Sequence, residues 1–221
     1  MPTKQSPASA SLQRLPRYLA YLKVRQKQGV YSVSSTTIAE DLRLNPVQVR
    51  KDLALATDAG RPRTGYPLDT LIDDLERFLG YDYTRDAFVI GAGRLGRALL
   101  GHSQFGEYGL SILAGFDTDE ALHGTEVDGK PIFPMEKLPN LAKRMRVQVG
   151  ILAVPNAAAQ DACEQMVDAG IRAIWNFATV PLTVPEHIIV QHENLAASFA
   201  ILSNQLANTL HQDGLEGGNQ P

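Results

Sequence analysis

The stretch Phe88-Val89-Ile90-Gly91-Ala92-Gly93-Arg94-Leu95-Gly96 decides the fold of this chain. Its apolar beginning predicts a strand over residues 87–90, and its glycines are spaced as in a loop that leads directly into a helix. A second apolar strand is expected over 110–116, and it ends in Asp117. A strand, a glycine loop, a helix, a strand and an acidic residue in this order predict the dinucleotide-binding half of a Rossmann-like parallel sheet in an α/β protein.

The residues of the loop have separate tasks. Gly91 permits the tight turn, Gly93 lets the backbone approach a pyrophosphate, and Gly96 lets the helix lie close to the strand. The helix is expected to open at Arg94 or Leu95, where its N–H groups and its dipole hold the phosphates.

Asp117 predicts which dinucleotide binds. A carboxylate at this position can accept hydrogen bonds from both ribose hydroxyls and would repel a 2′-phosphate, so NAD(H) is favoured over NADP(H). Asp119 and Glu120 add to the repulsion. The alternative is an acidic residue in an ordinary surface turn.

The alternation of strands and helices continues after Asp117. A third strand is expected near 132–133, then a strand over 147–154, a helix over 157–169 and a strand over 171–177. Ligands bind at the carboxyl ends of such strands. The expected cofactor-binding residues are therefore Gly91, Ala92, Gly93, Arg94, Leu95, Gly96, Asp117, Val154, Pro155, Phe177 and Ala178, of which Val154 and Phe177 could equally well be core residues.

The glycine loop begins only at residue 91, so a segment of different character precedes it. Residues 1–66 hold 11 Lys and Arg against 4 Asp and Glu, whereas residues 67–221 hold 10 against 20. A basic segment joined to an acidic body is typical of a DNA-binding domain on a ligand-binding domain, because positive charge attracts phosphate and releases its counterions. An ordinary solvated basic surface is the alternative.

The basic segment predicts three helices. After a tail over 1–11 that is expected to be disordered, Pro16 can open a helix that runs to about Gln28 and ends before Gly29. Its inner face carries Leu15, Leu19 and Leu22.

The second and third helices predict a helix-turn-helix. Ser34 and Ser35 precede a helix over 36–42, a turn follows over 43–45, and Pro46 starts a helix that runs to about Leu55. An ordinary helical hairpin is the alternative. In the third helix Val47, Val49 and Leu53 are expected to face inward and Gln48, Arg50 and Lys51 outward.

Residues 57–66 predict a wing. Two glycines and a proline turn the chain there, and arginines at such a turn can enter the minor groove of DNA. The expected DNA-binding residues are Ser35, Gln48, Arg50, Lys51, Arg61 and Arg63.

The remaining segments complete the expected domain organisation. With a connecting helix over 68–79, the winged helix-turn-helix domain is expected over 12–80 and the NAD(H)-binding domain over 81–194. A helix over 195–211 carries apolar residues at three- and four-residue steps, which need a partner subunit or a surface of the same subunit to bury them. These residues are Leu195, Phe199, Leu202, Leu206 and Leu210, and a disordered tail is expected over 212–221.

Several classes of protein are excluded. The single cysteine, Cys163, excludes an internal disulfide framework and a multi-cysteine zinc site, and no metal site is expected. Every apolar run is too short to span a membrane, and no secretory signal is visible. A cytoplasmic protein is therefore expected.

The sequence resembles the Rex family of redox-sensing transcriptional repressors over nearly its whole length. The basic segment 47–53, Val-Gln-Val-Arg-Lys-Asp-Leu, joined to this glycine loop is more specific than either alone. Further matching segments are Val33-Ser34-Ser35, Gly65-Tyr66, Phe116-Asp117, Ala153-Val154-Pro155, Ala169-Gly170-Ile171 and Asn176-Phe177-Ala178.

The resemblance implies an architecture and a mechanism. It implies a homodimer with N-terminal winged helices, Rossmann domains that bind NADH or NAD⁺, and C-terminal helices swapped between subunits. It further implies that NADH favours a closed dimer, while the NAD⁺ or free form binds an inverted-repeat operator and represses genes. Such a switch requires NADH to bind the closed state more tightly than the open one.

The chain also departs from the family pattern. Residues 55–66 replace an aromatic, glycine-rich wing. His102 stands where the family commonly has a tyrosine, and Asn194 stands where it has an aspartate. In the family these positions help to couple the nicotinamide to domain closure, so they are the expected switch positions, and a paralogue with altered or lost redox sensing is an alternative.

An NAD-dependent dehydrogenase with an N-terminal helical subdomain is the main rival. It requires a catalytic acid or base in a substrate domain, yet only about forty residues follow the last Rossmann strand, and none of the histidines there stands in a motif that marks it as one. We therefore expect a regulator rather than an enzyme. A CoA- or nucleotide-binding module is a second rival, against which the basic helix-turn-helix argues.

Overall fold

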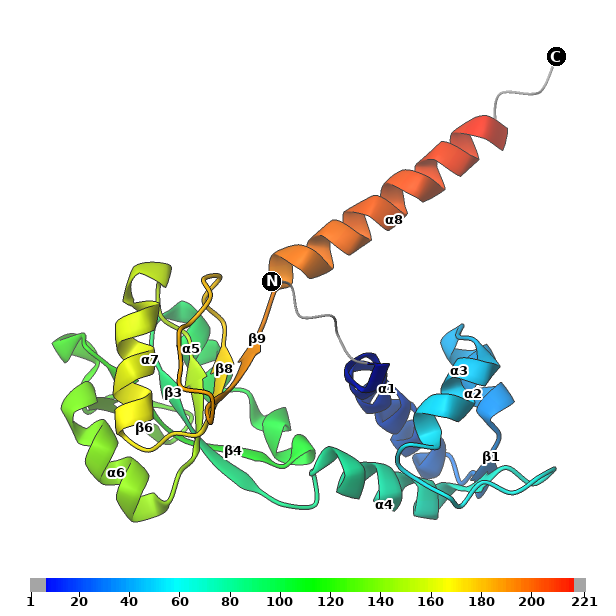
Figure 1. The fold of residues 1–221 in the computed structure, drawn as a ribbon, viewed down its shortest axis with the longest axis horizontal. Coiled ribbons are helices and arrows are strands. Elements are labelled where there is room, and N and C mark those ends of the chain that lie inside the picture. Colours follow the sequence, from blue (N-terminus) through cyan, green and yellow to red (C-terminus); the bar gives the residue numbers. More distant parts are fainter. Residues whose placement is uncertain (1–6, 217–221) are drawn as a thin grey trace. The chain divides into compact units, whose positions relative to one another are not determined.

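The structure, a computed structural model, describes residues 7–216 in two compact units (Figure 1). The first unit contains residues up to 84 and the short segment 107–109, and the second contains 85–106 and the residues from 110 onward. The tails predicted at both ends lie partly outside the described residues. Within the described part, no helix combines the length and the apolar character that crossing a bilayer requires.

The first helix is longer than the sequence predicted. α1 spans Pro7–Lys27, so residues 7–11 are helical rather than disordered, and Pro16 lies inside the helix instead of opening it. A proline at the first helical position has no N–H bond to lose, and Pro7 satisfies this as well as Pro16 would. Ser11 is buried, which anchors the early turns.

The helix-turn-helix forms as predicted. Its helices are α2 (Ser35–Leu42) and α3 (Pro46–Leu53). The Ser34 hydroxyl caps α2 by accepting from the N–H of Thr37 at 2.9 Å, and Asn45 Oδ1 caps α3 by accepting from the N–H of Val47 at 2.8 Å. Arg43 makes the turn between them in the left-handed conformation, at φ 54°.

The core of the first unit lies between α1, α3 and α4 (Leu68–Leu79). Leu15, Leu19 and Leu22 are buried as predicted. Val47 was expected to face inward, but its side chain is 58% exposed, whereas Val49 and Leu53 are fully buried. Residues two apart lie on nearly opposite sides of a helix, so Val47 cannot share the inner face with Val49.

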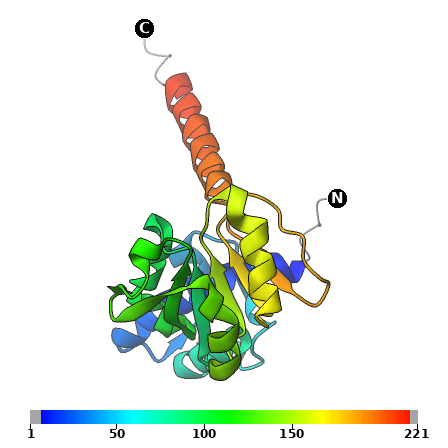
Figure 2. The same ribbon diagram turned by 90° about the vertical axis from the view of Figure 1, so that its left-hand side faces the viewer.

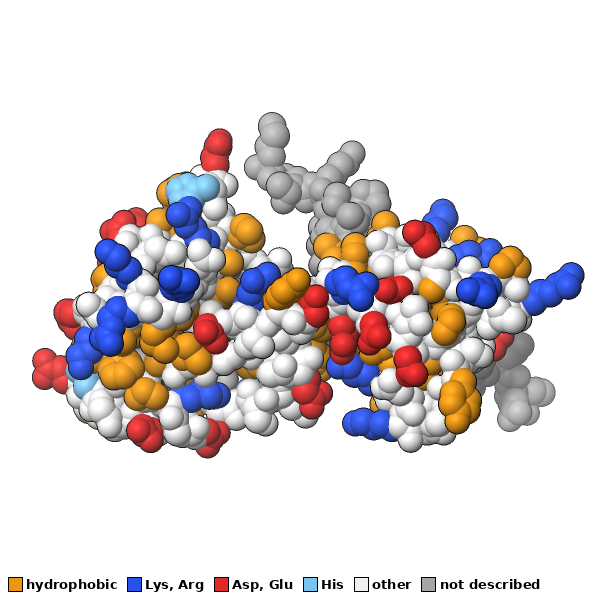
Figure 3. Space-filling model, turned by 90° about the horizontal axis from the view of Figure 1, so that it is seen from below, with side chains coloured by type: hydrophobic (Ala, Val, Ile, Leu, Met, Phe, Trp, Pro, Cys, Tyr) orange, Lys and Arg blue, Asp and Glu red, His pale blue; other side chains and the backbone are white. Residues whose placement is uncertain are grey.

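α4 is amphipathic. Its leucines and Ile72 point into the core, while Asp69 and Asp73 are exposed. Figure 3 shows acidic side chains gathered on the face seen from below, where α4 runs. Two further acids of α4 are paired with cations, Glu76 with Lys23 at 2.7 Å and Asp74 with Arg77 at 3.1 Å.

A seven-stranded sheet forms the second unit. The strands are β3 (Arg85–Ile90), β4 (Leu110–Asp117), β5 (Glu126–Val127), β6 (Lys130–Pro134), β7 (Val149–Leu152), β8 (Ala173–Asn176) and β9 (Ile189–His192). Their order is β5-β6-β4-β3-β7-β8-β9, and apart from the antiparallel β5–β6 pair all neighbours are parallel. Along the chain, β4 to β6 therefore lie on one side of β3, and β7 to β9 lie on the other side. The reversal of strand order beside β3 creates the switch point where Rossmann folds bind ligands.

Helices cover both faces of this sheet (Figure 2). They are α5 (Arg94–Leu100), α6 (Leu138–Met145) and α7 (Ala159–Asp168). Alternate residues of β3 belong to different cores: Phe88 and Ile90 pack in the core of α6 and α7, and Val89 packs in the core of α5. The sequence predicted α5, α7 and five strands, but missed β5, β9 and α6, which are short or only partly buried.

The C-terminal helix, α8, spans Leu195–Glu216 and is longer than predicted. Residues 212–216 are helical rather than part of a disordered tail, and 217–221 lie outside the described residues. Four side chains of the predicted stripe, Phe199, Leu202, Leu206 and Leu210, are between 58% and 69% exposed. These side chains therefore form an apolar stripe that is exposed in the single described chain.

Candidate functional site

The carboxyl ends of β3, β4 and β7 open into a cavity of about 500 Å³. Gly91 and Gly93 line it from the first turn, Asp117 from the end of β4, and Val154 and Pro155 from the end of β7. Residues from three predicted strand ends thus meet at the switch point, as expected for a Rossmann cofactor site.

Two glycines of the loop are sterically required. Gly91 adopts φ 92°, and a Cβ there would lie 2.6 Å from the carbonyl oxygen of Ala153. A Cβ on Gly96 would lie 1.7 Å from the carbonyl oxygen of Gly91, so any side chain would push α5 away from the loop. A Cβ on Gly93 would meet nothing within 4 Å, which leaves room beside the backbone for a pyrophosphate.

Asp117 holds the glycine loop in place. Its Oδ2 accepts from the N–H of Ala92 at 2.5 Å, and its Oδ1 accepts from the N–H of Asp119 at 2.9 Å. Each carboxylate oxygen has two lone pairs, so acceptor capacity for ribose hydroxyls is left. The ring of His123 adds a contact from Nε2 to the backbone oxygen of Asp117 at 2.9 Å.

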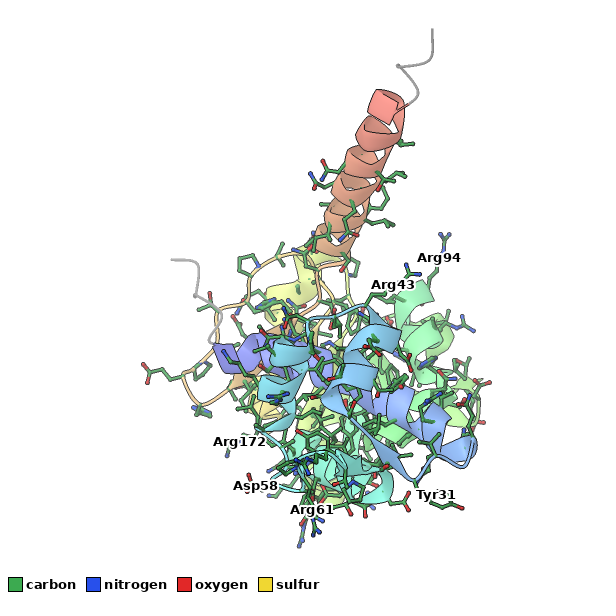
Figure 4. The ribbon with its side chains drawn as sticks, turned by 90° about the vertical axis from the view of Figure 1, so that its right-hand side faces the viewer. Tyr31, Arg43, Asp58, Arg61, Arg94 and Arg172 are labelled. Carbon is green, nitrogen blue, oxygen red and sulfur yellow. The ribbon has the colours of Figure 1, made fainter. Side chains whose placement is uncertain are left out.

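The other three predicted residues of the loop, Ala92, Arg94 and Leu95, differ in how deeply they are buried. Ala92 is fully buried behind the loop, and Leu95 is partly exposed. The side chain of Arg94 extends outward from the start of α5 (Figure 4). These three residues can contribute through backbone N–H groups, while the cavity wall itself consists of other side chains.

Phe177 and Ala178 follow β8 and are not among the residues that line the cavity. The N–H of Phe177 donates to the carbonyl of Leu152 at 2.9 Å, which aligns the ends of β7 and β8. Ala178 is buried in the core of α6 and α7, and Phe177 packs in the core of α5. Both residues therefore have core contacts, and neither forms part of the cavity wall.

Part of the cavity wall consists of residues that the sequence did not predict. Met135 follows the end of β6, Leu122 lies in the turn after β4, and Asp161 and Gln165 come from α7. The strand-end rule could have found Met135 once the third strand was assigned. Asp161 and Gln165 carried no such signal, because only the packing of α7 brings them to the cavity.

The two expected switch positions have structural contacts of their own. His102 is exposed, and its ring packs edge-on against Phe105 with ring centroids 4.7 Å apart. Asn194 caps α8, because its Oδ1 accepts from the N–H of Ala197 at 2.9 Å. An asparagine can therefore keep the capping function that an aspartate would have there.

In the first unit, the outer face of α3 is basic. Arg50 and Lys51 are exposed as predicted. Gln48 is exposed as well, but its Nε2 donates to Asp52 Oδ1 at 2.8 Å. Its amide is thus bound to the helix's own carboxylate and would have to release it in order to read a base.

Asp52 is a buried anchor for α3. It accepts hydrogen bonds from Arg14, Tyr18 and Ser11 of α1 as well as from Gln48. Burial alone would raise the pKa of its carboxyl, but these hydrogen bonds outweigh burial and hold the pKa well below its usual range. For Tyr18, burial and then the contact with Asp52 raise the pKa to about 12.

The predicted wing is a short hairpin. The N–H and carbonyl groups of Arg61 and Gly65 bond each other at 2.9 and 3.0 Å, and β1 (Ser32–Val33) pairs with β2 (Tyr66–Pro67) beneath it. Gly65 is required, because at φ 73° its Cβ would lie 2.4 Å from the carbonyl oxygen of Val33.

A second cavity, of about 500 Å³, lies between the wing, α3 and the start of α2. Arg50, Arg61 and Arg63 line it together with Ser35. Ser35 is buried, so it can contribute only to the floor. Figure 4 shows Arg61 pointing outward from the wing. Three guanidinium groups around one hollow fit a phosphate backbone.

Comparison with known proteins identifies the family. A family model described as a putative DNA-binding protein N-terminus matches residues 8–54, and one described as a CoA binding domain matches residues 82–180. The redox-sensing transcriptional repressor Rex of Treponema denticola is 44% identical over 202 residues, which cover 91% of this chain and 96% of that protein. The chain belongs to the Rex family of redox-sensing transcriptional repressors.

Further Rex proteins also match the chain over most of its length. Rex of Bacteroides thetaiotaomicron is 41% identical and covers 89% of each chain. A crystal structure of the Rex-family repressor RSP in complex with beta-NAD⁺ and operator DNA matches with a TM-score of 0.86 and 31% identity over 98% of this chain and all of that chain. RSP in complex with beta-NADH matches with a TM-score of 0.83 over 93% of this chain and 97% of that chain. The predicted family and fold class are confirmed.

Proposed function

We propose that this member of the Rex family is an NAD(H)-responsive transcriptional repressor that NADH releases from operator DNA. One observation carries this proposal: a single chain joins a cavity at the strand ends of a Rossmann-like sheet, lined by Gly91, Gly93 and Asp117, to a winged helix-turn-helix with a basic outer face. The crystal structures of RSP with beta-NAD⁺ and operator DNA and with beta-NADH support the same pairing of ligands.

Each part of the cofactor would be held by a different set of residues. The loop from Gly91 to Gly96 would bind the pyrophosphate, Asp117 the adenine ribose, and Val154, Pro155, Phe177 and Ala178 the nicotinamide end. Bound NAD(H) supplies a ring whose charge changes with its redox state. The protein's part is to bind one redox state more tightly in one arrangement of its domains, because equal affinity would shift nothing.

DNA binding would use both parts of the winged helix. Arg50 and Lys51 would meet the major groove and its phosphates, and Arg61 and Arg63 would reach from the wing. Gln48 would take part only after leaving Asp52.

The partner that covers α8 would be a second copy of the chain. Its exposed apolar stripe fits a homodimer, and a dimer with two winged helices matches an inverted-repeat operator. Since the named relatives are repressors, we further infer a regulator located in the cytoplasm rather than an enzyme.

Separate loss of the two binding functions tests the proposal. The probes are NADH and a DNA duplex that the protein selects from a random pool. Arg50→Ala and Lys51→Ala should weaken DNA binding and lower its salt dependence by about one phosphate contact each, with NADH binding unchanged. Lys143→Ala removes an exposed cation from the second unit and serves as the matched control. Loss of NADH and DNA binding together in Arg50→Ala would contradict two separate sites.

A further inference from the structure

The outer face of α3 carries an exposed valine near its start. Val47 is the second residue of this helix and is 58% exposed, whereas Val49 and Leu53 are fully buried. Single exposed apolar residues are common on protein surfaces, so exposure alone does not identify a contact. The position of Val47 is more informative, because the first residues of the second helix in a helix-turn-helix contact base edges in the major groove.

The start of α3 holds Val47 in a fixed position. Oδ1 of Asn45 accepts from the N–H of Val47 at 2.8 Å and from the N–H of Gln48 at 3.3 Å, so the first turn of the helix is capped. A valine side chain branches at Cβ and strongly prefers one rotamer in a helix. Its two methyl groups therefore present a surface that loses little conformational entropy when a ligand covers it.

Val47 lies in a hollow beside a cation. This open hollow, of about 590 Å³, is lined by Leu44, Asn45, Val47, Gln48 and Lys51. Lys51 follows Val47 by four residues, which places the two side chains next to each other on the helix surface. Because the ammonium group attracts phosphate, the partner that fits this face is a nucleic acid.

The polar side chain next to Val47 is engaged within the helix. Nε2 of Gln48 donates to Oδ1 of Asp52 at 2.8 Å, and this carboxylate is fully buried. Gln48 would lose this bond if it turned to a base, whereas the side chain of Val47 has no hydrogen bond to give up. An apolar side chain in the major groove discriminates between bases by contact with the 5-methyl group that thymine presents there.

We propose that Val47 contacts the 5-methyl group of a thymine in each operator half-site and thereby selects thymine at that position. The contact removes apolar surface of both partners from water, and the unmodified cytosine, adenine and guanine carry no methyl group on the same edge. This role rests on the proposed function, because it requires operator DNA. It adds an apolar base contact to the contacts proposed for Arg50 and Lys51.

Replacement of thymine by uracil isolates this contact, because the two bases differ by the 5-methyl group alone. The probe is the inverted-repeat duplex that the protein selects from a random pool. Uracil is placed at each thymine of a half-site in turn, together with the symmetric position of the other half-site. At one position we expect the affinity of the full chain to fall at least about fivefold, since the loss of one buried methyl group costs about fourfold in each half-site.

Two variants of Val47 differ from each other by one methyl group. Val47→Ser removes both methyl groups of the side chain, so its affinities for the thymine and uracil duplexes should differ by less than about twofold. Val47→Thr keeps one methyl group and should still respond about threefold or more. Val24→Ser makes the same change at another exposed valine, on α1, and should respond as the wild type does.

Two results would overturn the methyl contact: no thymine position at which uracil weakens binding of the wild type, or a response of Val47→Ser equal to that of the wild type. Release of the wild type from the same duplex by NADH is measured in parallel. If release occurs and no uracil effect depends on Val47, the methyl contact fails alone. If release does not occur and the uracil effect still depends on Val47, the proposed function fails alone. Failure of the chain to select any duplex would contradict both.

Discussion

Arg14 and Asp52 form a two-pronged ion pair between α1 and α3: Nε lies 2.6 Å from Oδ2, and Nη2 lies 2.8 Å from Oδ1. The carboxylate is fully buried, and the arginine side chain is 30% exposed. Ser11 and Tyr18 bond the same carboxylate. The helix α3, which carries Arg50 and Lys51, is thus held to α1 by the buried carboxylate of Asp52. Arg14 balances the charge of this carboxylate.

Asp52→Asn should destabilise the first unit by about 3 kcal/mol or more, because the buried donors around it lose their charged acceptor. Hydrogen exchange of the α1 and α3 amides reports this change, and Trp175 emission serves as the internal reference for the second unit. DNA affinity should fall with it. Asp69→Asn, an exposed aspartate on α4, should change stability by less than about 0.5 kcal/mol. Equal stability of the two variants would show that the Asp52 network is not an anchor.

The first unit should lose stability on acidification. The folded-state pKa of Asp52 is lowered, so its contribution is fully present above the unfolded pKa, about 3.9, and is lost as the pH falls below that value. Exchange of the α3 amides measured from pH 7 to pH 3, after correction for the intrinsic rates, should show this loss in the wild type. Asp52→Asn should show a smaller dependence on pH. A parallel decline in both proteins would assign the acid sensitivity to other groups.

Asp117→Asn should weaken NADH binding about tenfold and reduce the preference for NADH over NADPH. Hydrogen bonds to charged groups contribute about 1.5–3 kcal/mol against about 1 for neutral ones, and the neutral amide no longer repels a 2′-phosphate. Titrations of Trp175 emission with each nucleotide measure both effects. Glu136→Gln, an exposed acid in the same unit, is the control. An unchanged ratio of the two affinities would place the ribose elsewhere.

Leu202→Glu with Leu206→Glu should shift the protein from dimer to monomer, because two charges would be buried in the apolar stripe of α8. Sedimentation velocity measures the change. Asn208 lies on the opposite side of α8, and Asn208→Glu should remain dimeric. If the double variant stays a dimer of wild-type strength, α8 is not the dimer contact.

Local signals explain why most elements were predictable. Asn45 with Pro46, and Gly91 with Gly96, act through backbone geometry that a few residues determine, so the caps and the glycine loop could be predicted. The Asp52 network joins residues about forty positions apart, and no local pattern of the kind used for helices and turns encodes such pairings. The predictions for the start of α1 and for the side chain of Val47 were wrong. A proline can lie at the start of a helix or inside it, and the local sequence did not decide which of the two valines of α3 faces inward.

The central claim is tested most directly by DNA-binding titrations of the full chain at one salt concentration across NADH/NAD⁺ ratios. The probe is a fluorescent duplex with the inverted repeat that the protein selects from a random pool. We expect tight binding with NAD⁺ or without nucleotide, and a loss of affinity of at least about tenfold as NADH saturates the cavity, within the usual range of allosteric coupling. Equal DNA affinity with saturating NADH and with NAD⁺ would contradict a redox-responsive repressor.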